Sequence, residues 1–485
     1  IWNTGVIEHA TQTDYSKFGI AKDHPEVVKG KAGSPYAIKD YYDVDPDLAE
    51  DVPNRMKEYQ KLIQRTHKHG LKVVMDFVPN HVARQYHSDA KPKLVKDLGE
   101  DDVTDVFFSN QNNFYYLPCE SFRPRFDVSQ YADSAYREEP CKATGNDYFS
   151  NDPSIYDWYE TVKLNYGVDY KNNRSHDFYP IPDTWIKMRD ILVFWAKKKV
   201  DGFRCDMAEM VPADFWSWVI PQIKACNPEI IFIAEPYDPS QYRRFIHSGG
   251  FDFLYDKVGL YDTLRSIMRN ESPCSDISNS WKNIDGIQSH MLNFLENHDE
   301  QRIASPFFAG NAEKGKAGMI VASTINTGPI MVYNGQELGE PACKAEGFSG
   351  EDGRTTIFDY STIPSVQRWL NNQSTEQETE LHRFYTRLLN ICMTEKAIGE
   401  GLFFDVEYAN LDNPKFNTYK QFAYLRFIDN ELLLIACNFE DVDVQCSVNI
   451  PKHAFDFLKI VDGQNVGCKD LLSNREEIKQ IGRAS

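Results

Sequence analysis

The chain has 485 residues, a length that predicts two to four domains, although an α/β barrel can hold about 250 residues in one unit. Its 53 Lys and Arg residues against 72 Asp and Glu residues give a net charge of −19, which argues against a nucleic-acid partner because phosphates would be repelled. No apolar run approaches the roughly 18 residues of a membrane helix, so we expect no membrane span.

The cysteines and the first residues of the chain carry information about the cellular compartment. The ten cysteines are scattered without a CxxC pair, which favours free thiols and a reducing, cytoplasmic compartment. The chain opens on IWNTGVI (1–7), the pattern of a strand already under way. We therefore expect one strand before residue 1, and a periplasmic or secreted location stays open.

Short apolar runs that end in polar residues recur along the chain and predict strands. After residues 1–7, they cover residues 71–77, 201–207, 229–235, 251–256, 291–297 and 328–337. Segments with apolar residues at helical spacing lie between them, at residues 52–70, 184–199 and 313–328. This alternation predicts βαβ units and a parallel sheet, and one strand before residue 1 would complete an eight-stranded barrel.

The alternation is interrupted once and then ends. Residues 82–180 have little helical periodicity and many aromatic residues, which indicates an insertion after the strand at 71–77. After about residue 400 the pattern alternates with period two, as in an antiparallel β domain. We predict a barrel over residues 1–81 and 181–398, an inserted domain over 82–180 and a C-terminal β domain over 399–485.

Three carboxylates follow three different predicted strands: Asp206, Glu235 and Asp299. A single such residue is more often a helix N-cap, but the mouth of a parallel barrel would bring all three together. Clustered carboxylates resist joint ionisation, which leaves one protonated acid beside one ionised nucleophile. That pair is what glycoside hydrolysis requires.

Five motifs in order carry a family resemblance. They are SPYAIKDYYDVDP (34–46), DFVPNH (76–81), GFRCD (202–206), FIAEP (232–236) and FLENHD (294–299). Their sequence and spacing resemble the α-amylase family of glycoside hydrolases. The resemblance implies a TIM (β/α)8 barrel, an inserted B domain after strand 3 and a C-terminal antiparallel β-sandwich domain.

The resemblance assigns catalytic roles to the three carboxylates. Asp206 is the expected nucleophile, and Glu235 is the expected general acid and then base. Asp299 is expected to bind two sugar hydroxyls and to favour the distorted transition state. The expected outcome is retention of configuration, with the carboxyl groups of Asp206 and Glu235 about 5–5.5 Å apart.

The resemblance also implies substrate-binding residues: Tyr36, Asp76, His81, Arg204, His298 and Arg354. Tyr36 would stack on the sugar to be cleaved, and Arg204 would keep Asp206 ionised. Arg354 lies in a loop at residues 348–360 that follows the last predicted strand. Two readings of this loop stay open, an arginine that reaches the sugar with Asp352 as its partner, or a polar turn around Gly353.

No cofactor is expected for the chemistry. Whether the protein also binds a structural calcium ion stays an open question. Asn80 stands where some members of the family have a calcium-binding asparagine. The other ligands would come from the inserted segment. Met210 stands where many members have a histidine whose carbonyl binds the ion or which contacts substrate.

These residues predict a retaining hydrolase of α-glucosidic, mainly α-1,4, linkages in starch, maltodextrin or related oligosaccharides. Two alternatives remain. One is an α-glucan transglycosylase with the same catalytic residues, and the other is a non-catalytic glucan-binding relative, against which the three retained carboxylates argue. The expected partner is an α-glucan or malto-oligosaccharide, and the expected state is a monomer or weak oligomer.

Overall fold

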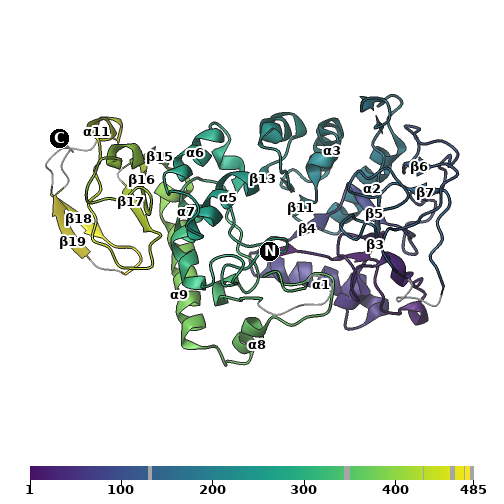
Figure 1. Ribbon diagram of the computed structural model, residues 1–485, viewed down its shortest axis with the longest axis horizontal. Coiled ribbons are helices and arrows are strands. Elements are labelled where there is room, and N and C mark those ends of the chain that lie inside the picture. Colours follow the sequence, from purple (N-terminus) through teal and green to yellow (C-terminus); the bar gives the residue numbers. More distant parts are fainter. Residues whose placement is uncertain (129–133, 343–349, 430, 459–464, 474–475, 481–485) are drawn as a thin grey trace. The chain divides into compact units, whose positions relative to one another are not determined.

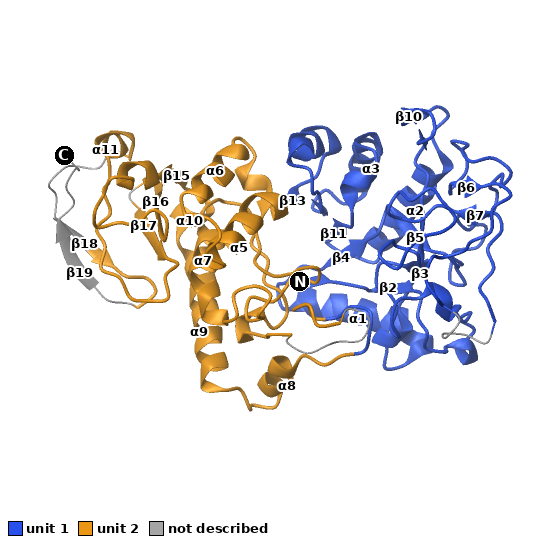
Figure 2. Cartoon of the chain, in the orientation of Figure 1, with its two compact units in different colours: residues 1–254, 356–360 blue, residues 255–355, 361–485 orange. Residues whose placement is uncertain are grey.

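The computed structural model describes residues 1–128, 134–342, 350–429, 431–458, 465–473 and 476–480. The chain forms two compact units (Figure 2). Unit 1 contains residues 1–254 and 356–360, and unit 2 contains residues 255–355 and 361–485. No helix in the described ranges combines the length and apolar character needed to cross a membrane. Eight described cysteines are free thiols: Cys119, Cys141, Cys205, Cys226, Cys274, Cys392, Cys437 and Cys446.

A parallel sheet runs through unit 1. Its neighbouring strands are, in spatial order, β1 (Trp2–Asn3), β4 (Val74–Phe77), β11 (Gly202–Cys205), β12 (Ile231–Ala234) and β13 (Phe253–Tyr255), whose last residue opens unit 2. Figure 1 shows β4 beside β11, where Arg204 pairs with Asp76. The residues of β4 and β11 are all buried, as expected for parallel strands that are covered on both faces. The predicted parallel sheet is confirmed.

Helices connect these strands. They are α1 (Arg55–Lys68), α2 (Asp183–Lys197), α3 (Ala213–Cys226) and the short α4 (Tyr242–Arg244). In α2, Trp185, Met188, Leu192 and Trp195 recur at helical spacing and are buried, which explains why this sequence packs as a helix. The helices predicted at 52–70 and 184–199 are therefore present, with ends shifted by a few residues.

The remaining strands of unit 1 form small antiparallel pairs. The pairs are β2 (Ile7–His9) with β3 (Ile38–Val44), β5 (His81–Ala83) with β8 (Thr161–Lys163), β6 (Tyr116–Leu117) with β7 (Cys141–Lys142), and β9 (Val168–Asp169) with β10 (Ser175–His176). Residues 82–128 and 134–180 contain no α-helix. The extents of the predicted domains stay predictions.

Unit 2 continues the strand–helix alternation. Its elements up to residue 399 are α5 (Asp262–Met268), α6 (Asp276–Asn283), β14 (Met291–Leu292), α7 (Gly315–Thr324), α8 (Pro364–Leu370), α9 (Glu376–Thr394) and α10 (Lys396–Gly399). The strand predicted at 328–337 is reduced to one parallel bridge between Asn293 and Ile330. After this bridge, Gly335 has a φ of +88°, a left-handed conformation that does not continue an extended strand.

The C-terminal part of unit 2 is antiparallel, as its period-two pattern predicts. Its sheet has the order β15 (Leu402–Asp405), β16 (Gln421–Ile428), β17 (Glu431–Asn438), and β18 (Asn465–Lys469) pairs with β19 (Glu476–Gln480). Helix α11 (Lys452–Leu458) contributes Ala454 and Leu458 to a small core with Val406, Phe416, Ala423 and Leu425.

Candidate active site

Two carboxylates of unit 1 lie at the ends of adjacent parallel strands. Asp206 directly follows β11, and its N–H donates to the carbonyl of Phe77 at 2.9 Å. Glu235 directly follows β12, and its N–H donates to the carbonyl of Cys205 at 3.3 Å. These bonds continue the strand ladder to both residues. The register therefore brings the two acids to one edge of the sheet, and both are buried.

One guanidinium group connects the acids. Arg204 Nη1 lies 2.9 Å from Asp206 Oδ1 and 3.2 Å from Asp76 Oδ1, and Nη2 lies 2.7 Å from Glu235 Oε1. The arginine is 1% exposed. Buried carboxylates are expensive without a cation, and the planar guanidinium can face several at once. Arg204 thus offsets the cost of placing three acidic side chains together.

Glu235 is held by two further donors that the sequence did not predict. The backbone N–H of Met207 donates to Oε2 at 2.9 Å, and the hydroxyl of Tyr237 donates to Oε1 at 3.1 Å. Met207 has a φ of +44°, the left-handed region that non-glycine residues rarely adopt. This backbone turn, immediately after Asp206, presents the N–H to Glu235.

A second acid fixes the turn that carries Tyr237. Glu209 Oε2 accepts hydrogen bonds from the N–H groups of Tyr237 at 2.8 Å and Asp238 at 2.9 Å. Glu209 belongs to the 3₁₀ helix Ala208–Met210, so it ties the loop after β11 to the loop after β12. Its position three residues after Asp206 was the only signal in the sequence, and this position alone does not distinguish it from a surface acid.

Tyr36 lies against the same arginine. Its hydroxyl donates to Asp76 Oδ2 at 3.4 Å, and the centre of its ring lies 5.6 Å from the guanidinium carbon of Arg204. The aromatic ring is buried. The structure therefore groups five of the predicted site residues in unit 1: Tyr36, Asp76, Arg204, Asp206 and Glu235.

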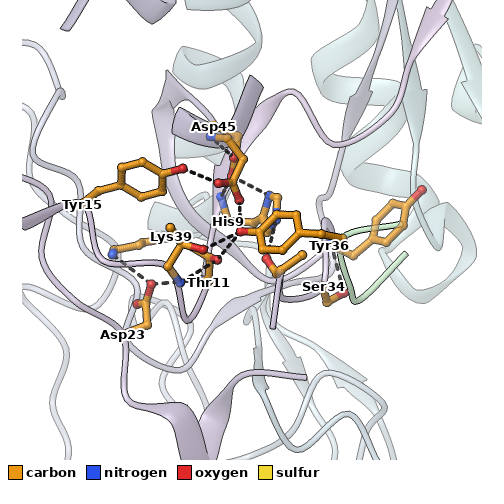
Figure 3. Close-up of polar contacts among 12 residues, drawn as sticks. His9, Thr11, Tyr15, Asp23, Ser34, Tyr36, Lys39 and Asp45 are labelled. Carbon is orange, nitrogen blue, oxygen red and sulfur yellow. Dashed lines mark hydrogen bonds and ion pairs between the residues drawn. The ribbon is translucent and has the colours of Figure 1, made fainter. Parts of the chain in front are cut away.

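A buried polar network supports the segment before Tyr36 (Figure 3). Ser34 Oγ accepts the N–H of Tyr36 at 3.3 Å. His9 Nδ1 lies 2.7 Å from Asp45 Oδ2, and Nε2 lies 3.2 Å from the carbonyl of Ala32. Burial by itself would lower the pKa of His9, but Asp45 outweighs it and raises that pKa above its ordinary value. Oxygen acceptors at both ring nitrogens fit the imidazolium form.

His81 lies on β5 and is neutral. Burial, and then the charges of Lys163 and Lys29, lower the pKa of His81 to about 3. Its Nδ1 lies 3.2 Å from the amide nitrogen of Asn80, which also donates to the carbonyl of Gly145 at 2.8 Å. Because Nδ1 accepts, the ring proton is on Nε2, where it can serve as a donor to a ligand.

The surroundings of Asn80 do not fit a calcium ion. Asn80 Oδ1 accepts a hydrogen bond from the ammonium of Lys163, which also lies 3.3 Å from the carbonyl oxygen of Met210 and 2.7 Å from Asp147 Oδ1. Calcium requires six to eight oxygen ligands at about 2.3–2.6 Å. A positive ammonium already contacts the oxygens that the ion would use, so the two cations compete for one position.

Another carboxylate cluster is formed by β2, β3 and the loop that contains Asp89. Ligand atoms of Glu8, Asp40 and Asp89 lie within 4.8 Å of one another, so this group could hold a metal ion. Burial, and then the neighbouring charge of Asp40, raise the pKa of Glu8 to about 9. A proton on Glu8 therefore lowers the charge of the cluster at neutral pH without any ion.

The motif FLENHD lies in unit 2, and its first acid has a structural role. Glu296 is 1% exposed. Its Oε2 lies 2.9 Å from Arg302 Nη1, and its Oε1 accepts the N–H of Ile303 at 2.7 Å. Arg302 also donates its own N–H to the carbonyl of Gly353. Glu296 thus stabilises the loop after the strand by binding residues 302 and 303 of the same loop. The sequence alone assigned this residue no role.

The other polar residues of this motif form a tight turn. Asn297 Oδ1 accepts the N–H groups of Asp299 at 2.8 Å and Glu300 at 2.9 Å. His298 Nε2 lies 2.9 Å from Asp299 Oδ2, and the Asp299 side chain is 41% exposed. The turn therefore leaves the Asp299 carboxylate accessible beside a buried imidazole.

Arg354 also belongs to unit 2. Its Nη1 lies 3.6 Å from Asp352 Oδ2, and its N–H donates to Asp352 Oδ1 at 2.9 Å. Gly353 between them has a φ of +82°, so the polar turn is present. The Arg354 side chain is 44% exposed, and its contact with a sugar stays a prediction. Residues 348 and 349 of this loop lie outside the described ranges.

Comparisons with known proteins identify a domain match and several similar chains. Residues 23–247 match the sequence model of the alpha-amylase catalytic domain. Alpha-amylase 2 of Dictyoglomus thermophilum is 22% identical over 420 residues, which cover 85% of this chain and 60% of that relative. The chain thus spans about three fifths of that protein's length.

Two further matches extend the comparison. An alpha-1,4-glucan:maltose-1-phosphate maltosyltransferase of Cereibacter sphaeroides is 24% identical over 237 residues, covering 44% of this chain and 36% of that protein. The crystal structure of a maltogenic alpha-amylase, AmyB, from Thermotoga neapolitana superposes with a TM-score of 0.61 at 20% identity, covering 100% of this chain and 86% of that one. These matches confirm the predicted resemblance to the alpha-amylase family and the predicted fold, an alpha-amylase-type TIM barrel with an antiparallel C-terminal sheet.

Proposed function

We propose that this protein is a retaining glycoside hydrolase that cleaves α-glucosidic, mainly α-1,4, linkages in starch, maltodextrin or related oligosaccharides. The single observation that carries the proposal is the contact of one buried guanidinium, Arg204, with both Asp206 and Glu235. Retaining glycosidases require two carboxyl groups that flank one glycosidic bond. The match of residues 23–247 to the alpha-amylase catalytic domain supports an α-linked glucan as the substrate.

The reaction has two displacement steps. In the first, a carboxylate oxygen of Asp206 attacks the anomeric carbon, the glycosidic C–O bond breaks, and Glu235 gives its proton to the leaving oxygen. In the second, Glu235 takes a proton from water, the water oxygen attacks the same carbon, and the ester to Asp206 breaks. Two inversions give net retention, and Arg204 favours the ionised Asp206 that both steps need.

The remaining site residues are proposed to bind the sugar. Tyr36 and Asp76 would contact the sugar beside the nucleophile, and His81 would donate from Nε2 to a hydroxyl. The neutral state of His81 supports this role because it leaves one ring nitrogen with a proton and no net charge. His298, Asp299 and Arg354 carry the hydroxyl-binding roles that the family pattern implies.

Product analysis of the purified full chain tests the proposal. Maltoheptaose, pullulan and cyclodextrins would be digested by the wild type, by Asp206→Asn and by the control Asp190→Asn, which changes an exposed acid. We expect Asp206→Asn to lower kcat by at least about 10³-fold and the control to leave it unchanged. Full activity in Asp206→Asn would reject Asp206 as the nucleophile.

Transglycosylation is the second candidate. In that reaction a sugar hydroxyl replaces water in the second step, with the same two carboxyl groups. The similarity to a protein named as a maltosyltransferase favours this alternative. Accumulation of oligosaccharides longer than maltotriose from maltotriose alone would identify a transferase, whereas glucose and maltose as the main products would support hydrolysis.

A further inference from the structure

Lys163 is a buried cation that the proposed chemistry does not use. It ends β8 and pairs with His81 across the β5–β8 ladder. The residue is 2% exposed. A buried ammonium is costly unless oxygen atoms replace the water that it loses, so its partners need an explanation.

The three oxygen partners of the ammonium come from three separate segments of unit 1, and the ring of Tyr170 lies 5.8 Å from it. Asn80 follows β4, Met210 ends the 3₁₀ helix after Asp206, and Asp147 lies in the inserted segment. Two partners offer neutral oxygens and one offers a carboxylate. The ammonium and the carboxylate balance each other, and the exposed Arg174 lies 3.3 Å from the second carboxylate oxygen, Asp147 Oδ2. The ammonium thus has three oxygen partners, as a bound cation would.

We propose that the ammonium of Lys163 is a built-in cation that ties the inserted segment to the loop after the nucleophile and takes the place of a structural metal ion. The position is defined by Asn80 Oδ1, the Met210 carbonyl and the Asp147 carboxylate. Lys163 is a positioning residue, because none of these atoms is a reacting group.

The ammonium also orients the ring of His81. Ammonium only donates hydrogen bonds, so the amide oxygen of Asn80 must face Lys163. The amide nitrogen then faces the carbonyl of Gly145 and Nδ1 of His81. One charge thus selects the amide orientation of Asn80 and, through it, the His81 tautomer that carries its proton on Nε2.

The position of Lys163 predicts that a calcium ion can take the place of the ammonium when the lysine side chain is removed. With Lys163 present, a divalent ion is repelled by the ammonium and finds its oxygens occupied. When the side chain is shortened, three oxygens remain around an empty volume, and the negative charge of Asp147 is then opposed only by the exposed Arg174 at its other oxygen. Such a site, completed by water, is suited to calcium.

The test compares Lys163→Ala with the wild type and with Lys171→Ala, an exposed lysine of the same segment. Thermal melting and maltoheptaose hydrolysis would be measured after EDTA treatment and at rising calcium chloride concentrations. We expect EDTA and calcium to change neither the wild type nor Lys171→Ala. Lys163→Ala should lose about 10-fold or more in kcat/KM and regain at least half of the loss with millimolar calcium.

Two controls keep the outcomes separate. Glu8→Gln in parallel identifies calcium held by the Glu8, Asp40 and Asp89 cluster. If Lys163→Ala does not fold, Lys163→Met tests the loss of kcat/KM alone, because its side chain fills the volume that calcium would need and no rescue by calcium is expected. The calcium titration followed by melting, on the wild type and on Glu8→Gln, needs no activity measurement, so its failure is distinct from failure of the proposed function.

The proposal is overturned by any of three results. The first is a wild type that loses melting temperature in EDTA, regains it with calcium and still does so with Glu8→Gln. The second is a Lys163→Ala variant with wild-type kcat/KM. The third is a folded Lys163→Ala variant that loses activity without gaining any response to calcium.

Discussion

The hydroxyl of Tyr237 donates to Glu235 Oε1, and this bond is one of three that orient the proposed acid and base. Tyr237→Phe removes the donor and keeps the ring. We expect kcat/KM to fall about 10-fold, equivalent to ~1.4 kcal/mol, because a hydrogen bond to an ionisable group is lost. The measurement is steady-state hydrolysis of maltoheptaose across pH 4–9.

Tyr156→Phe is the matched control for this substitution, because the Tyr156 side chain is 92% exposed. It should leave both kcat/KM and the shape of the pH–rate profile unchanged. Tyr237→Phe should also change the limb of the profile that reports the acid and base group. Identical profiles for the two variants would mean that Tyr237 does not act on Glu235.

At the scale of one element, the turn that leads to Tyr36 depends on a close backbone approach. Gly33 has a φ of +83°, and a Cβ at this position would lie 1.7 Å from the carbonyl oxygen of Ala10. Gly19 has a similar φ of +87°, and a Cβ there would meet nothing within 4 Å. The two glycines therefore separate the cost of the left-handed conformation from the cost of the clash.

Alanine substitutions at these two positions give a direct comparison. We expect Gly19→Ala to lower the free energy of unfolding by about 1 kcal/mol, from backbone strain alone. Gly33→Ala should cost at least about 2 kcal/mol more and also lower kcat/KM, because the segment that carries Tyr36 must move. Urea denaturation and maltoheptaose hydrolysis measure the two effects, and equal costs at both positions would contradict the packing of this turn.

At the scale of the whole molecule, each unit buries a carboxyl group that prefers to be neutral. Burial raises the pKa of Glu8 in unit 1 to about 9 and, with Asp405 as a further cause, the pKa of Glu407 in unit 2 to about 8. The ordinary value is near 4.5. At any pH between this ordinary pKa and the raised pKa of the group, the folded chain keeps a proton on the carboxyl group that the unfolded chain has released.

The free energy of unfolding should therefore fall as pH rises from about 4.5 through 8 or 9. Each group, Glu8 for example, lowers it by up to about 1.4 kcal/mol per pH unit. Below the ordinary value both states are protonated, and the contribution is complete. His9, whose pKa is also raised, adds a loss in the same direction as pH rises above its ordinary value of 6.5.

Replacing the two carboxyl groups tests this dependence. Glu8→Gln and Glu407→Gln should melt near the wild-type temperature at pH 4 and above it at pH 9, because each amide stays neutral at both values. Glu378→Gln is a useful comparison, since the pKa of Glu378 is lowered and its loss should show the opposite pH dependence. Melting curves of the variants that run parallel to the wild type would contradict the raised pKa values.

Some of this site could be predicted from local patterns. Apolar runs that end in Asp206 and Glu235 indicated strand ends, and alternating strands and helices indicated a parallel sheet that aligns such ends. Other parts could not be predicted. Nothing near Glu296 in the sequence shows that it faces Arg302 rather than a ligand, because the answer depends on how the loop after the strand folds back.

The amino-acid sequence by itself determined the strand–helix order, the carboxylates at strand ends and the excess of negative charge. These follow from periodicity and residue type, which are local properties of the chain. Only the tertiary structure decided which cations meet those oxygens. Arg204 on β11 reaches Glu235 at the end of the neighbouring strand β12, and Lys163 reaches Asn80, 83 positions earlier in the chain. Such contacts depend on strand register and on the path of the inserted segment, and a buried charge is stable only where that packing supplies its partner.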